Sequence, residues 1–303
     1  MSHALTALII LATSLLAPPA PQGLLLRYRP EVGQTAVYRV SMDMSGAQTL
    51  QDEPRTVNVR AEMEVTEKVM SLEPDGSFWL RVTGRTVRIH DPTGTFGAGQ
   101  YGEWPAVEVR LSPLGVVMET RPDPEAGHLG PLQRAFAAAM SHPAPVVLPT
   151  QAVRVGDRWQ WEQDRAHQSN RLVSVTQAGG PIAHICGGAQ LRCLLASAGR
   201  EPVRLDEASP ALGLTTRVSG EVTQTCEVEL LLPSGLAVAH TGEMRLRTEG
   251  ESVLELPQEP TEPGSAVNDA KGASPRTFSL KSDLRVRLHL RLVALNGSAV
   301  PGG

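Results

Sequence analysis

The chain has 303 residues and a formal net charge of −4 at pH 7, with 41% hydrophobic and 20% charged residues. That length suits one large β domain or two of ordinary size, and the small, mixed charge argues against a general nucleic-acid-binding surface. Aromatic residues make up only 4%, whereas there are 28 glycines and 24 prolines. The composition therefore predicts a core of aliphatic side chains and a chain with many turns.

The N-terminus carries an apolar run from Ala4 to Ala17, followed by small residues and prolines. Its length is typical of a secretory signal and is short for a membrane span. We predict a signal peptide over residues 1–22 and an exported protein, periplasmic or extracellular. A short buried helix or an uncleaved anchor is the alternative. No later segment is long and apolar enough to predict a transmembrane span.

Alternation of apolar and polar residues dominates the first half, which we predict to be a β unit over residues 23–125. In "TVNVRAEMEV" the apolar residues Val57 to Val65 fall on one face and the charged residues on the other. "EPDG" at Glu73–Gly76 predicts a turn, and the alternation resumes at Phe78. The two alternating segments around this turn therefore predict a β-hairpin with one solvent-exposed face.

We predict one helix and a Pro-rich linker over residues 126–150. In "GPLQRAFAAAMSH" Leu132, Phe136 and Met140 recur at fourfold spacing, and Pro131 suits the first helical turn. "HPAPVVLPT" then ends the helix, because proline cannot continue it.

We predict a second β unit over residues 151–303. Its clearest strand runs from Phe278 to Leu292, where the large apolar residues fall on even positions. A strand that long must curve with its sheet or contain a bulge. We predict a polar loop at Glu201–Ala211 and a disordered loop at residues 255–277, where proline, glutamate, glycine and serine dominate.

A similar short sequence motif, or phrase, stands near the start of each half. Val32, Gly33 and Tyr38 align with Val155, Gly156 and Trp161 at an offset of 123 residues, and a later pair of Pro-turn-Gly patterns ends at Gly115 and Gly235. The spacing suggests an internal repeat, with chance similarity as the alternative. The expected fold is all-β with minor α content. It has two similar halves of curved antiparallel sheet, sandwich or half-barrel-like, with one connecting helix.

The aromatic residues of these phrases are candidate ligand-binding residues: Trp159, Trp161 and Tyr38. Trp159 and Trp161 are two residues apart and therefore point to one face of a strand. They either anchor the core or form an aromatic platform for a sugar or lipid.

The phrases "LRYRPEVGQTAVYRVSM" and "LPTQAVRVGDRWQWEQ" resemble those of a group of exported bacterial proteins of unknown function. In that group an early G-x-x-x-x-Y strand precedes an LP…V-x-V-G-D-x-W phrase that opens a second β half. The resemblance covers most of the chain after residue 22. It implies the two-half β architecture and brings no catalytic residues.

No motif for catalysis, a cofactor or a metal site is found, and we predict none of the three. Cys186 and Cys193 flank a predicted hairpin tip and form a possible disulfide, with unpaired buried thiols as the alternative. Arg285, Arg287 and Arg291 lie on one strand face, which suits contact with an anionic surface or ordinary solvation.

These observations leave three hypotheses on function. The first is a non-enzymatic envelope protein that binds an unknown envelope partner. The second is a carrier of a lipid or another apolar ligand between curved sheets, which would require an apolar pocket. The third is a hydrolase with a dispersed site, which would require a buried histidine or carboxylate of perturbed pKa in a cleft.

Overall fold

The computed structural model describes residues 23–50, 53–92, 102–122, 146–163, 165–178, 190–209, 214–232, 234–254 and 276–300. Within these ranges all the regular structure is β-strand, which confirms the all-β expectation. The strands are β1 (Thr35–Leu50), β2 (Glu53–Leu72), β3 (Phe78–His90), β4 (Gly102–Leu111), β5 (Val117–Pro122), β6 (Arg158–Gln163), β7 (Ala166–Gln177), β8 (Leu191–Ser209), β9 (Leu214–Leu232), β10 (Leu236–Leu254), β11 (Arg276–Leu295) and β12 (Ser298–Ala299).

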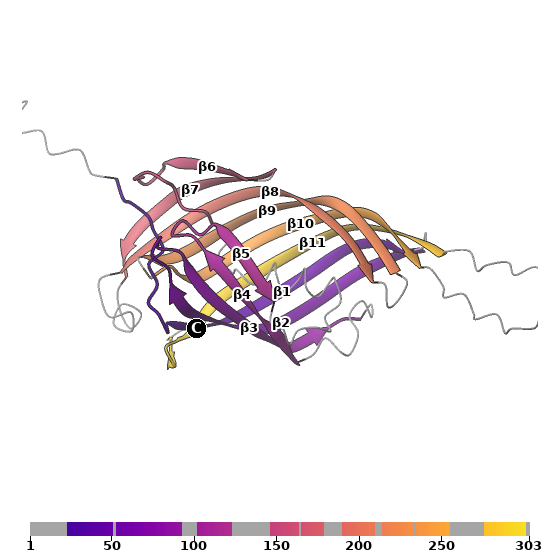
Figure 1. The fold of residues 1–303 in the computed structure, drawn as a ribbon, viewed down its shortest axis with the longest axis horizontal. Coiled ribbons are helices and arrows are strands. Elements are labelled where there is room, and N and C mark those ends of the chain that lie inside the picture. Colours follow the sequence, from indigo (N-terminus) through magenta and orange to yellow (C-terminus); the bar gives the residue numbers. More distant parts are fainter. Residues whose placement is uncertain are drawn as a thin grey trace, which may run out of the picture.

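All the strands belong to one antiparallel sheet in the order β5-β4-β3-β2-β1-β11-β10-β9-β8-β7-β6, with the short β12 paired to β11. Two runs of neighbouring strands make up the sheet: β1 to β5 form one meander, and β6 to β10 form the other. Strand β11 joins them by pairing with β10 on one side and β1 on the other. The sheet is not closed, so β5 and β6 lie at its two edges (Figure 1).

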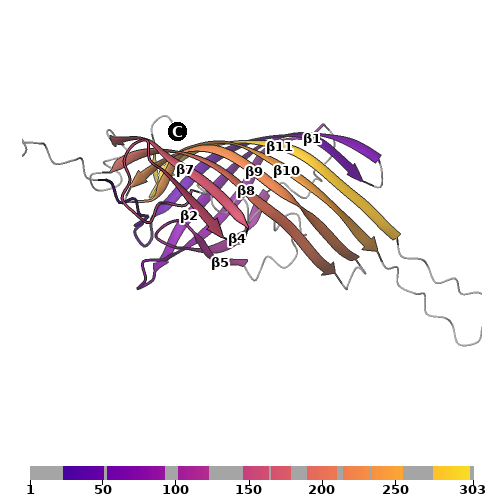
Figure 2. The same ribbon diagram turned by 90° about the horizontal axis from the view of Figure 1, so that it is seen from above.

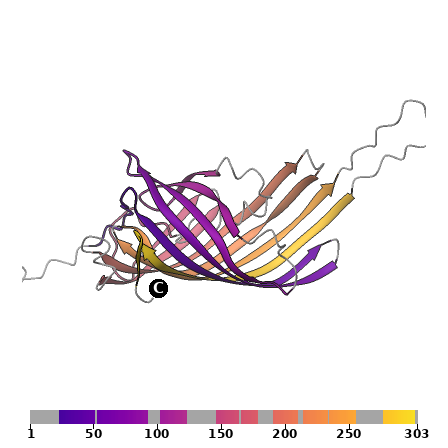
Figure 3. The same ribbon diagram turned by 90° about the horizontal axis from the view of Figure 1, so that it is seen from below.

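The sheet curves so strongly that it folds back on itself. Figure 1 shows β3, β4 and β5 lying in front of one end of β8 to β11, while the other end of these long strands extends beyond them. The views from above and below show the same crossing (Figures 2 and 3). We call the covered end the closed end and the other the open end. Buried side chains from both meanders form one core cluster.

Alternation gives the sheet two chemically different faces, as the sequence predicts for a half-buried sheet. We call the face that carries Tyr38, Leu230 and Leu290 the inner face, because these side chains are buried in the core. The outer face carries most of the charged residues. Bulges shift the register between Val37 and Tyr38 and between Ala237 and Ala239, and a bulge increases the local twist of a strand.

Two predicted loops are shorter than expected. The polar stretch Glu201–Ala211 was expected to be a loop, but β8 continues through Ser209 and pairs with β9 down to Leu214. Likewise Arg276 and Thr277, placed in the 255–277 loop, begin β11 and pair with Leu254 and Val253. In both places a long neighbouring strand supplies backbone hydrogen bonds that outweigh the polar composition.

Other predictions fall outside the described residues. These are the signal peptide at 1–22, the helix within 126–145 and the disordered stretch at 255–275. Residues 146–150, at the end of the predicted linker, form no helix, and Val146, Val147 and Leu148 are buried. This short segment passes through the core and becomes part of the site described below.

The two opening phrases form turns with the same hydrogen bonds. Gly33 donates to the Val69 carbonyl and Gly156 to the Leu172 carbonyl, at 2.9 and 2.8 Å. The return bonds, from the Val69 and Leu172 amides to the residues that follow each glycine, are also shared. Both glycines have positive φ, 85° and 97°. The geometry is what a repeat would produce, and common descent of the halves stays a prediction.

Candidate functional site

A cleft of about 320 Å³ lies between the inner face of the second meander and the turn that joins β4 to β5. It combines aliphatic side chains with amide, carboxylate, guanidinium and imidazole groups. Its lining comes from Gly115, Val116, Val117, Val147, Trp161, Gln163, Ala166, His167, Gln168, Gly199, Arg200, Glu201, Pro202, Val222 and Gln224. Apolar walls with a few polar groups are the usual character of a ligand site.

One row of the sheet places the central residues of this cleft side by side. Trp161 on β6 is opposite Gln168 on β7, Gln168 is opposite Gly199 on β8, and Gly199 is opposite Gln224 on β9. Because Gly199 has no side chain, its neighbours approach closely: a methyl group there would lie 3.2 Å from Nε2 of Gln224. The indole of Trp161 therefore lies along the cleft with two amides.

The segment Val146–Leu148 forms the back of the cleft and is fastened by side chains of β6 and β7. The Val147 amide donates to Oε1 of Gln168 at 2.9 Å, and the Val147 carbonyl accepts from Nε1 of Trp159 at 2.7 Å. Nδ2 of Asn170 donates to the same carbonyl at 3.2 Å. These bonds explain the buried polar residues on the inner face of β7.

A strip of half-exposed apolar side chains continues from the cleft across the open end. Val222 and Gln224 on β9 are opposite Leu246 and Met244 on β10. The strip goes on through the β11 residues Leu284, Val286 and Leu288 towards β1. Three interstrand steps from β9 to β1 amount to about 14 Å. We call these five residues of β10 and β11 the apolar strip.

A second, smaller cavity of about 30 Å³ lies at the closed end, where the two meanders meet. Its polar lining includes Tyr28, Tyr38, Glu67 and Ser234, and its apolar lining includes Phe78 and Leu236. We call the contact of Tyr28, Tyr38 and Glu67 with the turn Ser234–Ala237 the seam. It joins the N-terminal segment, β1 and β2 to the start of β10.

The carboxyl group of Glu67 is unusual within the seam. The residue as a whole is half-buried, but its Oε1 atom is sealed from solvent and has no hydrogen-bond partner among the described residues. Burial raises the pKa of Glu67 to about 7, although a hydrogen bond with the Tyr38 hydroxyl opposes the shift. Burial and the neighbouring Glu67 also raise the pKa of Tyr28 and of Tyr38.

Tyr28 connects the seam to the cleft. Its ring lies between two glycine turns, because a methyl group on Gly115 would come within 2.5 Å of Cε2 and one on Gly235 within 2.5 Å of Cδ1. Its hydroxyl donates to the Val146 carbonyl at 3.2 Å, next to the residue that forms the back of the cleft. Gly115 itself lines the cleft.

The predicted ligand-binding residues are thus separated. Trp161 lines the cleft, Trp159 is half-buried against the core and supports the back of the cleft, and Tyr38 is fully buried in the seam. Sequence reasoning did not identify Glu67, Gln168 or Gln224. A signal for Glu67 was present: it shares the phase of the apolar residues Val57 to Val69 and is the one charged residue of that phase between them.

The predicted basic row lies on the outer face among carboxylates. Arg285 and Arg287 both contact Glu243 on β10, at 2.5 and 3.5 Å. Arg291 lies opposite Arg39 and Ala239. The charge of Arg285 and Arg287 is therefore shared with Glu243, and their pairing holds the pKa of that carboxyl below its usual value.

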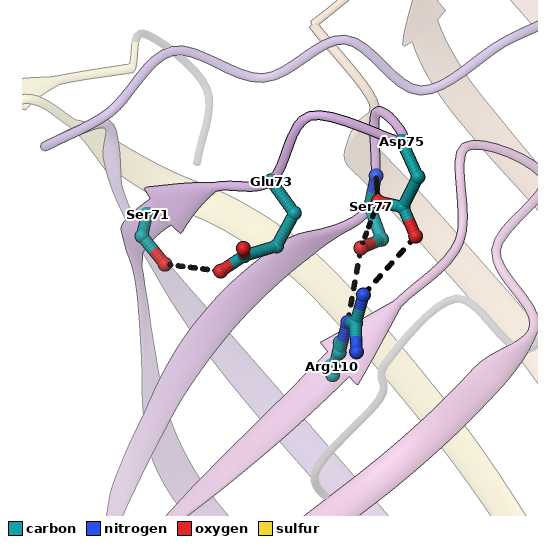
Figure 4. Close-up of polar contacts among 5 residues, drawn as sticks. All are labelled: Ser71, Glu73, Asp75, Ser77 and Arg110. Carbon is teal, nitrogen blue, oxygen red and sulfur yellow. Dashed lines mark hydrogen bonds and ion pairs between the residues drawn. The ribbon is translucent and has the colours of Figure 1, made fainter.

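Another polar cluster secures the turn between β2 and β3 (Figure 4). The Asp75 carboxylate accepts hydrogen bonds from the Ser77 amide at 2.9 Å and the Ser77 hydroxyl at 2.6 Å, which lower the Asp75 pKa. Arg110 of β4 reaches both residues, at 3.0 Å to Ser77 and 3.1 Å to Asp75. These bonds tie the turn between β2 and β3 to β4, and we assign them a structural role.

The cysteines offer no reactive group in the described residues. Cys193 and Cys226 are buried free thiols, and burial raises the pKa of each to about 11. Cys186, the predicted partner of Cys193, lies outside the described residues, so that disulfide stays a prediction. Within the described part of the chain, no group of three or more His, Cys, Asp or Glu residues is arranged to hold a metal ion.

Comparison with known proteins adds no family assignment. No protein-family model matches the chain, and no curated protein is significantly similar to it. The resemblance to exported bacterial proteins therefore stays a prediction. Among the residues that the structure describes, no helix is long and apolar enough to cross a membrane.

Proposed function

We propose that the protein is an exported, non-enzymatic carrier that binds an amphiphilic ligand such as a lipid on the inner face of its curved sheet. The observation that carries the proposal is the continuity of the cleft with the apolar strip. The polar end of the ligand occupies the cleft beside Trp161, Gln168 and Gln224, and its apolar chain lies along β10 and β11.

The energetics favour such a ligand. The apolar strip is only partly buried, although its β11 residues pack against the core, whereas the inner-face side chains of the same strands are buried at the closed end. Covering apolar surface is worth about 25 cal/mol for each Å² removed from water. An acyl chain that covered the strip would recover burial that the sheet alone does not provide, and it would do so along a path of about 14 Å.

The polar groups of the cleft suit binding more than catalysis. The two side-chain amides in the central row donate and accept hydrogen bonds but do not act as acids or bases near neutral pH. The Gln168 carbonyl oxygen already accepts bonds from the Val147 amide and Asn170. His167 at the rim contacts Glu162 at 3.0 Å and is solvated. The arrangement can orient a polar head group without reacting with it.

The test is binding of the fluorescent apolar probe N-phenyl-1-naphthylamine, compared with native mass spectrometry of the protein from an exported fraction. We expect Trp161→Ala to weaken probe binding by about tenfold, because an aromatic contact and its buried area are lost. The matched control is Trp79→Ala. Trp79 is half-exposed on the outer face, where the Arg121 guanidinium stacks at 4.2 Å from the ring centre.

Two results would contradict the proposal. One is equal probe affinity in both tryptophan variants and the parent. The other is a bare chain in native mass spectra together with no probe binding, which would favour the alternative of an envelope protein that binds a protein partner. Extra mass in the range of a lipid that disappears on denaturation would support the carrier.

A further inference from the structure

The seam holds a carboxyl group that the proposed carrier function does not use. Among the described residues the titratable side chains lining its cavity are Tyr28, Tyr38 and Glu67, and no lysine, arginine or histidine lines it. Two arginines of the adjoining elements are held by other groups. Arg27 donates to the carbonyls of Pro149 and Thr150, and Arg110 binds Asp75 and Ser77.

A carboxylate in this place is unstable as a charged group. Among the described residues that line the cavity, one oxygen has no partner, the other faces a tyrosine hydroxyl, and no cation balances the charge. Burying an unpaired ion costs far more than burying its neutral form. The closed seam therefore prefers Glu67 with its proton, whereas a seam opened to water accepts either form.

Opening of the seam would reach the cleft through a short chain of contacts. The cavity is bounded by Tyr28, whose ring rests on Gly115 and whose hydroxyl holds the Val146 carbonyl. Backbone bonds run beside it, from the Tyr28 amide to Pro113 at 2.9 Å and from the Leu148 amide to Leu114 at 2.8 Å. If Tyr28 moves, the turn at Gly115 and the segment Val146–Leu148 both lose the contact that holds them beside the cleft.

We propose that Glu67 is a proton-operated control of the ligand cleft: the neutral carboxyl keeps the seam closed, and loss of its proton opens the seam and releases the ligand. This inference rests on the proposed carrier function. The control differs from ligand contact, because Glu67 does not line the cleft and acts through Tyr28 and the segment Val146–Leu148.

The direction of the pH dependence follows from the pKa values. The pKa of Glu67 is about 7 in the closed seam, against an ordinary value of 4.5. The closed form is fully favoured below pH 4.5, becomes less favoured as the pH rises to about 7, and changes no further above that. Over this interval the opening equilibrium should increase on the order of a hundredfold.

The first measurement is amide hydrogen exchange against pH, corrected for the intrinsic rate. In the parent protein we expect the Tyr28 and Leu148 amides to show the increase in opening. In Glu67→Gln, which keeps the shape and cannot ionise, we expect no such increase. The Gly156 amide, bonded to Leu172 in a turn away from the seam, is the internal control. Equal pH profiles in parent and Glu67→Gln, or an equal response of Gly156, would overturn the proposal.

Two further variants sharpen the result. Glu62→Gln removes an exposed carboxylate from the outer face of the same strand and should leave the profile unchanged. Tyr38→Phe removes the hydrogen bond that lowers the Glu67 pKa, so the midpoint of the profile should move to higher pH. This variant decides the question if Glu67→Gln does not fold, because an unmoved midpoint would contradict the role of Glu67.

Probe binding separates the two proposals. If N-phenyl-1-naphthylamine binds more weakly as pH rises in the parent but not in Glu67→Gln, the control is linked to the cleft. If the amides respond and the affinity does not, the link to the cleft is overturned. If the probe binds at no pH, the carrier function fails, and the exchange data still decide whether Glu67 controls the seam.

Discussion

The closed and open ends of the sheet are made of the same strands and the same alternating pattern, yet they differ in what covers them. On β11 the inner-face residues Leu290, Leu292 and Leu295 are buried, whereas Leu284, Val286 and Leu288 are half-exposed. At the closed end the first meander crosses over and supplies Phe78 and Leu111, and the segment before β1 supplies Tyr28. At the open end the described strands have no such cover.

The difference teaches that the apolar phase of a strand does not by itself define a core. The same alternation serves packing where a second layer lies opposite, and where none does it leaves apolar surface that the proposed ligand would cover. It follows that mutations of similar size should separate into two classes. Those at the closed end should affect stability, and those at the open end should mainly affect binding.

The largest effect is expected from Tyr28→Ala at the closed end. Removing this ring should cost about 3–5 kcal/mol of unfolding free energy, because it leaves a cavity between the turns at Gly115 and Gly235. Leu284→Ala at the open end should cost about 1 kcal/mol, since the side chain is half-exposed. Urea denaturation of both variants measures the contrast, and equal costs would remove the distinction between the two ends.

An intermediate effect is expected at the paired turns. Gly33→Ala and Gly156→Ala should each cost about 1 kcal/mol, because a side chain is strained at their positive φ although no atom lies within 4 Å of the added methyl group. Thermal unfolding compares the two variants. Similar shifts would support equivalent turns in the two halves, and a clear difference would argue that their shared hydrogen bonds are coincidental.

The smallest effect is expected on the outer face. Glu243→Gln removes the carboxylate that Arg285 and Arg287 share, but all three groups are solvated. The loss of stability should be barely measurable and should disappear at high salt, as for other exposed ion pairs. Denaturation at low and high ionic strength tests this. A large loss of unfolding free energy that did not depend on salt would mean that the ion pairs of the outer face stabilise the fold.

Much of the fold could be predicted from the sequence, because alternation and turn residues are local signals. The hairpin at Glu73–Gly76 and the long C-terminal strand are both found where their patterns indicate. The length of β8 was missed, since pairing with β9 outweighs the polar composition of Glu201–Ala211. The order of the strands, with β11 between the meanders, depends on contacts that no local pattern encodes.

The candidate site was harder to predict. Trp161 was identified because tryptophan is rare in this chain, and its position in the cleft was not predictable from spacing. The cleft depends on the crossing of one meander over the other, which brings Val116 to Gln168. Glu67 was visible as a charged residue in an apolar phase, but its chemistry depends on its burial and on a cavity whose described lining holds no cation, which only the packed structure reveals.

The position of β11 also sets the order in which the molecule can be completed. Residue 36 pairs with residue 295, so the two meanders become one sheet only when the last long strand arrives. Until then β1 and β10 each present a bare strand edge, the kind of edge that pairs with other chains. Contacts so distant in sequence form slowly. The chain therefore spends its most vulnerable interval as two nearly finished halves that lack the strand between them.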